Sequence, residues 1–87
     1  MNYSSEFSKE LERKLTKIQK KNRKQFEIII KKIIEIKENP EHYKQLRYDM
    51  KHLRRVHIGK SFVLVFEIKG NIILFQDFDH HDNIYRR

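Results

Sequence analysis

The stretch Arg55-Val56-His57-Ile58-Gly59-Lys60-Ser61-Phe62-Val63-Leu64-Val65-Phe66 decides the fold of this 87-residue chain. Its second half is an unbroken apolar run, which indicates a central strand that is covered on both faces. In its first half the residues alternate, so Val56 and Ile58 share one strand face while Arg55 and His57 share the other. The glycine between the halves predicts a turn. A purely structural strand does not need an arginine and a histidine on one face, so we expect an anionic partner here.

Two helices precede this stretch, and one more strand follows it. Apolar residues recur at helical spacing from Ser8 to about Asn22 and again from there to Asn39-Pro40. The segment 2–6 is compatible with a short edge strand, and residues 72–78 read as a further strand after the turn Lys69-Gly70-Asn71. The predicted fold class is therefore α+β: a short N-terminal strand, a helical hairpin and an antiparallel three-strand meander, all in a single domain spanning residues 1–87.

The composition restricts the class of function. Lysine and arginine number 20 against 12 acidic residues, a formal net charge of +8 with neutral histidine, so polyanions such as nucleic acid are the expected partners. The chain has no cysteine, which excludes disulfides, thiol catalysis and cysteine-ligated zinc. It also has no apolar run long enough to span a membrane and no signal-peptide pattern, so we expect a soluble, cytoplasmic protein with no membrane partner.

The C-terminal tail Asp79-His80-His81-Asp82-Asn83-Ile84-Tyr85-Arg86-Arg87 is polar and repeats the chemistry of the first stretch. We interpret the two as opposite walls of one site. If the tail continues as a strand, His80 and His81 point to opposite faces, so the sequence predicts no metal site. No small-molecule cofactor is expected either.

The order of elements, together with the quoted stretch and the closing His81-Asp82-Asn83-Ile84-Tyr85, resembles the RelE/ParE toxin superfamily. The resemblance is closest to archaeal RelE-type toxins and covers nearly the whole chain. It implies a RelE-like fold and a cognate RelB-like antitoxin as partner. It also implies that the protein enters the ribosome and cleaves messenger RNA, as mRNA interferases of the RelE branch do, whereas the ParE branch inhibits DNA gyrase.

The resemblance also assigns roles residue by residue. Arg55 and His57 fall where RelE-type toxins carry paired basic residues, and Tyr85 matches a C-terminal aromatic that stacks on a base. His81 matches a position that holds arginine in many members and histidine in YafQ-type toxins. The sequence departs from the family at Val63, where many members have an arginine that contacts the scissile phosphate. With histidines at positions 57 and 81, the predicted site resembles YafQ-type toxins in its use of histidine.

The same residues suit RNA cleavage on chemical grounds. Attack by the 2′-hydroxyl on the phosphate needs a base, an acid and stabilisation of negative charge, but no metal. Histidine, with an unperturbed pKa near ~6.5, can serve in both protonation states. We assign His57 as base and His81 as acid, although the sequence leaves their order open. Arg55 would stabilise the phosphate and Tyr85 would stack on a base. Four nearby residues are predicted to bind the RNA backbone: Lys51, His52, Arg54 and Lys60.

The sequence therefore predicts the toxin of a type II toxin–antitoxin system. Its predicted activity is that of a ribosome-dependent endoribonuclease, which inhibits translation by cleaving messenger RNA in the A site. Two alternatives remain open at this point. One is a ParE-like toxin that inhibits DNA gyrase without being an enzyme, and the other is a basic RNA-binding module.

Overall fold

A four-stranded sheet in the order β1-β4-β3-β2 organises the computed structural model, which describes residues 3–85. Strand β1 (Ser4–Phe7) pairs in parallel with β4 (Ile72–His80) at one edge. Strand β3 (Phe62–Lys69) pairs antiparallel with β4 on one side and with β2 (Leu53–Ile58) on the other. The predicted meander is confirmed, and the predicted N-terminal strand joins it as a fourth member. Residue 2, part of that prediction, lies outside the described residues.

The helical hairpin begins and ends where the sequence predicts. Helix α1 (Lys9–Lys21) follows Ser8, whose Oγ accepts a hydrogen bond from the backbone N–H of Leu11 at 3.1 Å. Asn22 ends α1 and caps α2 (Arg23–Glu38), since its Oδ1 accepts from the N–H of Gln25 at 3.1 Å. Asn39-Pro40 ends α2, and Pro40 opens the short 3-10 helix η1 (Pro40–His42). Among residues 3–85, none of the helices combines the length and apolarity needed to cross a bilayer.

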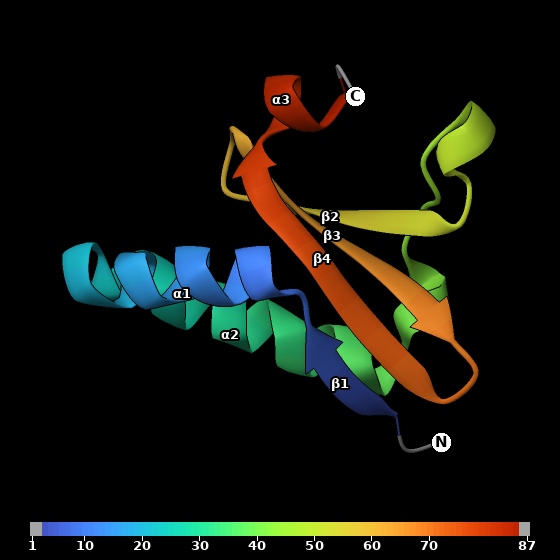
Figure 1. Ribbon diagram of the computed structural model, residues 1–87, viewed down its shortest axis with the longest axis horizontal. Coiled ribbons are helices and arrows are strands. Elements are labelled where there is room, and N and C mark those ends of the chain that lie inside the picture. Colours follow the sequence, from blue (N-terminus) through green and yellow to red (C-terminus); the bar gives the residue numbers. More distant parts are fainter. Residues whose placement is uncertain (1–2, 86–87) are drawn as a thin grey trace.

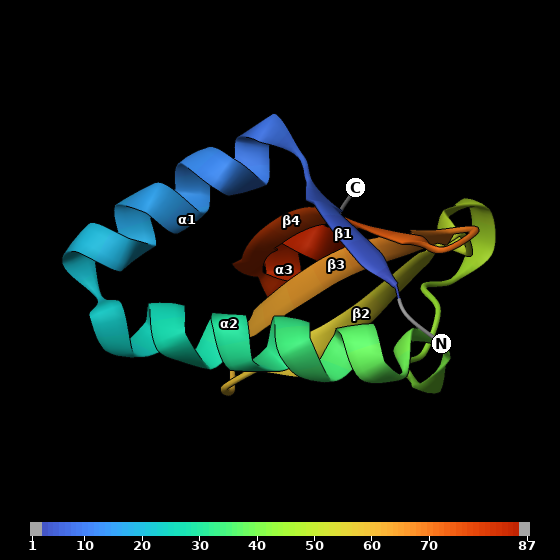
Figure 2. The ribbon, with the colours of Figure 1, turned by 90° about the horizontal axis from the view of Figure 1, so that it is seen from below.

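Strand β3 is buried on both faces, as its apolar run predicts. The side chains of Val63, Leu64, Val65 and Phe66 are at most 3% exposed. Leu64 and Phe66 pack in the larger core under α1 and α2, whereas Val63 and Val65 pack on the opposite face with Leu46 and Ile84. Figure 1 shows this arrangement, with the hairpin on one side of the sheet and helix α3 (His81–Tyr85) on the other. Figure 2 shows α1 and α2 as the two diverging arms of the hairpin, with α2 crossing in front of β2 and β3.

The C-terminal tail corrects one expectation, because it does not continue as a strand. Strand β4 ends at His80, and His81 is the first residue of α3. The carboxylate of Asp79 accepts the backbone N–H of His80 at 2.7 Å, and the N–H of His81 donates to the carbonyl of Ser61 at 2.8 Å. These bonds turn the chain, and the helix then buries Ile84 against the sheet. The argument that strand alternation separates His80 from His81 is therefore wrong.

A buried ion pair joins the hairpin to β4 just before this turn. The Nζ of Lys14 on α1 lies 2.7 Å from a carboxylate oxygen of Asp77, which is 2% exposed, and 3.5 Å from Asp79. Partial burial disfavours the charged form of Lys14, but the hydrogen bond and charge of Asp77, and then Asp79, outweigh it and raise the pKa of Lys14. The side-chain amide of Asn83 donates to Asp79 at 3.0 Å, so the network extends from α1 into α3.

Replacing Lys14 by methionine should destabilise the protein by about 3 kcal/mol, because the buried carboxylate of Asp77 loses the charge that compensates it. Urea unfolding followed by circular dichroism measures the change. The exposed Lys17→Met on the same helix is the matched control and should stay within about 0.5 kcal/mol of wild type. Equal effects of the two substitutions would contradict the role given to the Lys14–Asp77 pair.

Asp79 should make stability depend on pH in the acid range. The hydrogen bond from Asn83 is the largest cause that lowers the pKa of Asp79; burial, the next largest, opposes it, and the His80 N–H and Lys14 add to the lowering. A lowered folded-state pKa means that the stabilisation is present above the unfolded value near 3.8 and is lost as the pH falls through the folded value. Asp79→Asn should therefore be less stable than wild type at pH 7, and the difference should shrink at pH 3. A difference that is the same at both pH values would count against this assignment.

Candidate active site

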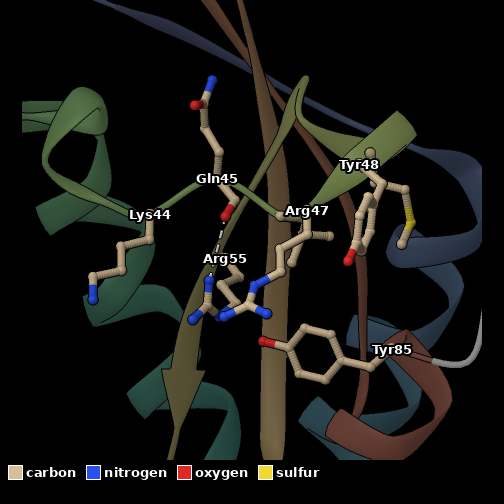
Figure 3. Close-up of a pocket in the computed structure, with 8 residues that line it drawn as sticks. Lys44, Gln45, Arg47, Tyr48, Arg55 and Tyr85 are labelled. Carbon is tan, nitrogen blue, oxygen red and sulfur yellow. Dashed lines mark hydrogen bonds between the residues drawn. The ribbon is translucent and has the colours of Figure 1, made fainter.

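A pocket of about 540 Å³ lies between α3 and the segment that precedes β2. Figure 3 shows its lining side chains, which come from three separate parts of the chain. Arg55 comes from β2 and Tyr85 from α3, and the others belong to or flank the 3-10 helix η2 (Tyr48–Met50): Lys44, Gln45, Leu46, Arg47, Tyr48 and Met50. The segment with η2 and helix α3, which carry most of this lining, lie on the sheet face opposite the helical hairpin (Figure 1).

The pocket is suited to an anion. Its lining includes the cations Lys44, Arg47 and Arg55 but no carboxylate. The Nη1 of Arg55 donates to the carbonyl of Gln45 at 3.5 Å, while its buried Nε has no hydrogen-bond partner among the described residues. Both Arg47 and Arg55 line the pocket, and in the view of Figure 3 the hydroxyl of Tyr85 points toward their guanidinium groups. Two guanidinium groups so placed match the oxygens of a phosphate.

Tyr85 lines this pocket with its aromatic ring, and the imidazole of His81 lies beside that ring without lining the pocket itself. Tyr85 remains 44% exposed, and the guanidinium carbon of Arg55 lies 5.8 Å from the centre of its ring. His81 precedes Tyr85 by one helical turn, so the two side chains share a face of α3, and their ring centres are 6.0 Å apart. Three of the four predicted catalytic residues, Arg55, His81 and Tyr85, therefore lie together around the Tyr85 ring, whereas His57 does not join them, and the roles of all four stay a prediction.

The pocket wall opposite α3 is fixed to β2 by backbone hydrogen bonds. The backbone N–H of Leu46 donates to the carbonyl of Leu53 at 2.9 Å, and the backbone N–H of Arg55 donates to the carbonyl of Lys44 at 3.1 Å. Leu46, only 3% exposed, anchors this segment in the smaller core.

Tyr48, by contrast, is 81% exposed and adopts a left-handed φ of 60°. A bulky residue rarely adopts this conformation, and an exposed one gains no packing from it.

The remaining predicted site residues lie around the pocket rather than in it. His57 is exposed and shares a strand face with Arg55, yet it makes no ring contact, ion pair or side-chain hydrogen bond with the described residues. Arg54 lies on the opposite face, where its Nη1 donates to the carbonyls of Glu41 at 3.2 Å and Tyr43 at 2.7 Å. Three further residues are exposed in the turns at the two ends of β2: Lys51, His52 and Lys60.

Sequence reasoning missed Arg47 and Tyr48 as site residues. No periodicity marks their segment, and η2 is only three residues long. One signal was available: the apolar Leu46, in an otherwise polar stretch, is followed directly by a basic and an aromatic residue, shortly before the basic strand β2. That anchor holds the segment against β2 and so places both side chains beside Arg55.

Comparisons with known proteins agree on one superfamily. Residues 5–85 match the family model described as the ParE toxin of the type II toxin–antitoxin system parDE. The candidate toxin RelE4 of Methanocaldococcus jannaschii is 47% identical, over 98% of this chain and 93% of its own. Two solved structures share the fold at lower identity. The YoeB dimer of Staphylococcus aureus has a TM-score of 0.81 and is 16% identical, covering 93% of this chain and 99% of its own.

The second structure is the RelBE2 toxin–antitoxin complex of Mycobacterium tuberculosis. It has a TM-score of 0.77 and is 15% identical, covering 92% of this chain and 99% of that one. These matches confirm the resemblance drawn from the sequence and the predicted α+β, RelE-like fold. The chain belongs to the RelE/ParE superfamily of toxins from type II toxin–antitoxin systems.

Proposed function

We propose that this toxin is an endoribonuclease that cleaves messenger RNA in the ribosomal A site and thereby inhibits translation in the cytoplasm. One observation carries the proposal. A pocket with three cations and no carboxylate in its lining includes an exposed tyrosine ring, and a histidine outside the lining lies beside that ring. Cations without acidic partners suit phosphates, and an exposed ring suits a base that is turned out of its stack.

Each residue has a role in attack by the 2′-hydroxyl. His81 gives a proton to the leaving 5′-oxygen, and His57 takes the proton from the 2′-hydroxyl. Arg55, whose Nε still has a free donor, stabilises the charge that builds up on the phosphate, and Arg47 adds a second guanidinium beside it. Tyr85 stacks on a base and fixes the scissile bond. Lys51, His52 and Lys60 contact the RNA backbone, as does Arg54 on the other face of β2. No step needs a metal or a cofactor.

Two partners follow from this proposal. His57 does not contact His81 in the free protein, so the ribosome would have to orient the RNA between them, and cleavage of free RNA should be poor. The M. tuberculosis relative was solved as a complex with its antitoxin, which supports a RelB-like antitoxin for this chain. The formal charge of +8 favours an acidic antitoxin segment that folds on binding.

The matching family model supports a second candidate, because it describes ParE toxins. A ParE-like toxin would inhibit DNA gyrase by binding, without acid–base chemistry. Such an inhibitor has no need for an imidazole and a tyrosine beside a phosphate-sized cluster of guanidinium groups. We therefore rank the nuclease first, and the assay below separates the two.

Primer extension on a translated messenger RNA tests the nuclease directly. With purified ribosomes, wild type should produce cuts at codon-phased positions, and these should be absent without ribosomes. His81→Ala should slow cleavage by about 10²-fold or more, as expected for loss of a general acid, and Tyr85→Ala should also weaken it. His42→Ala, an exposed histidine outside the pocket, is the control and should cut like wild type. A folded protein that makes no cuts but blocks gyrase supercoiling would favour the ParE-like candidate.

Substitution of Arg47 tests the pocket separately from the histidines, because the structure, and not the sequence, identifies Arg47 as a lining residue. Arg47→Ala should reduce ribosome-dependent cleavage by about tenfold or more, because one charge-assisted hydrogen bond to phosphate contributes at least ~1.5 kcal/mol. Arg13→Ala on α1, on the other side of the sheet, removes the same charge and should leave the rate close to that of wild type. Equal losses in both variants would mean that overall charge, not the pocket, controls the rate.

A further inference from the structure

The junction between β4 and α3 brings three metal-ligating side chains together. One ligand atom from each of His80, His81 and Asp82 lies within 4.8 Å of the other two. Three consecutive residues cannot converge in this way on a continuous strand, where neighbouring side chains point to opposite faces. They converge here because the chain changes from strand to helix between His80 and His81.

The spacing of these atoms fits one metal ion. The Nδ1 of His81 lies 2.7 Å from one carboxylate oxygen of Asp82, and the Nδ1 of His80 lies 3.7 Å from the other. Ligands that bind zinc at 2.0–2.2 Å lie at similar separations from one another. The close approach at His81 is an ion pair with Asp82 when the ring is protonated, and among the described residues its buried Nδ1 has no partner with hydrogen-bond geometry. His80 would give up only a long bond of 3.3 Å from the N–H of Asp82.

We propose that His80, His81 and Asp82 bind a first-row transition-metal ion such as Zn²⁺, and that the bound ion inhibits the toxin. Two imidazoles and one carboxylate are ligands that suit zinc, copper and nickel rather than magnesium or calcium. Water would complete the coordination, since all three side chains are partly exposed. The site forms within the last part of the chain and needs no other element.

Inhibition follows from the proton chemistry of His81, and this part rests on the proposed function. A metal bound at Nδ1 leaves the proton of the neutral ring on Nε2. The ring can then neither become the imidazolium that a general acid requires nor accept a proton as a base. His81 therefore loses either role, whichever one it has. The same ion would not disturb Arg47 or Arg55, so binding of RNA should survive while cleavage stops.

Calorimetric titration with zinc chloride in metal-free buffer tests the site itself. Wild type should bind one ion per chain, and so should His42→Ala, which removes an exposed histidine elsewhere. His80→Ala and Asp82→Asn should bind at least about tenfold more weakly, since even the loss of an outer-shell partner of a metal ligand has that effect. Equal binding by all four proteins, or no saturable binding by wild type, would overturn the proposal. Circular dichroism of each variant confirms that it is folded.

Two further readouts separate this inference from the proposed function. Zinc should shift the imidazole NMR signals of His81 in wild type but not in His80→Ala, and this result does not depend on any activity. In the ribosome assay, zinc should suppress cleavage by wild type and leave His80→Ala active, with recovery on adding a chelator that prefers zinc to magnesium. Binding without ribosome-dependent cleavage under any condition would overturn the nuclease alone. Cleavage that zinc leaves unchanged would overturn the inhibitory role.

Discussion

The burial of β3 on both faces is the constraint on which the rest of the structure depends. Val63, Leu64, Val65 and Phe66 have almost no exposed surface, so the chain must cover two sides of one strand with only 87 residues. The amphipathic hairpin covers one side. On the other side Met50 and Leu53 pack partly buried, and the buried anchors are Leu46 and Ile84, each carried by a short segment. Those two anchors bring the segment with η2 and helix α3 to the same sheet face, and the pocket forms where they meet.

The ion pair between Lys14 and Asp77 connects the helical hairpin to strand β4. It fixes α1 to β4 immediately before the strand ends, and Asp79 continues the contact to Asn83 on α3. The helix that carries His81 and Tyr85 is therefore held by charges from the hairpin as well as by the packing of Ile84. Removing a partner from such a buried network is costly, which makes these polar residues structural rather than catalytic.

Periodicity was enough to predict most of this fold, and it failed where elements are short. The helices, their caps and the three-strand meander follow from spacing, and alternation places Arg55 and His57 on one face correctly. The sequence could not show that β1 pairs with β4, because strand pairing between distant segments leaves no local pattern. It also missed the change from strand to helix at His81, which depends on hydrogen bonds from Asp79 and Ser61. Arg47 and Tyr48 escaped notice for the same reason, since a buried leucine and two backbone hydrogen bonds, not a motif, place them.

The central claim is that the pocket supports attack by the 2′-hydroxyl of an RNA substrate, and its geometry makes the claim specific. In the proposed mechanism the guanidinium groups would bind the phosphate, Tyr85 would hold a base, and the histidines would move protons. A ParE-like toxin would use the same face only as a contact surface. The most direct measurement uses ribosomes programmed with a synthetic messenger RNA that has one 2′-deoxynucleotide at the scissile position. We predict that this RNA stays intact while its all-ribose counterpart is cut to leave a 2′,3′-cyclic phosphate; cleavage of the deoxy-substituted RNA would contradict the account.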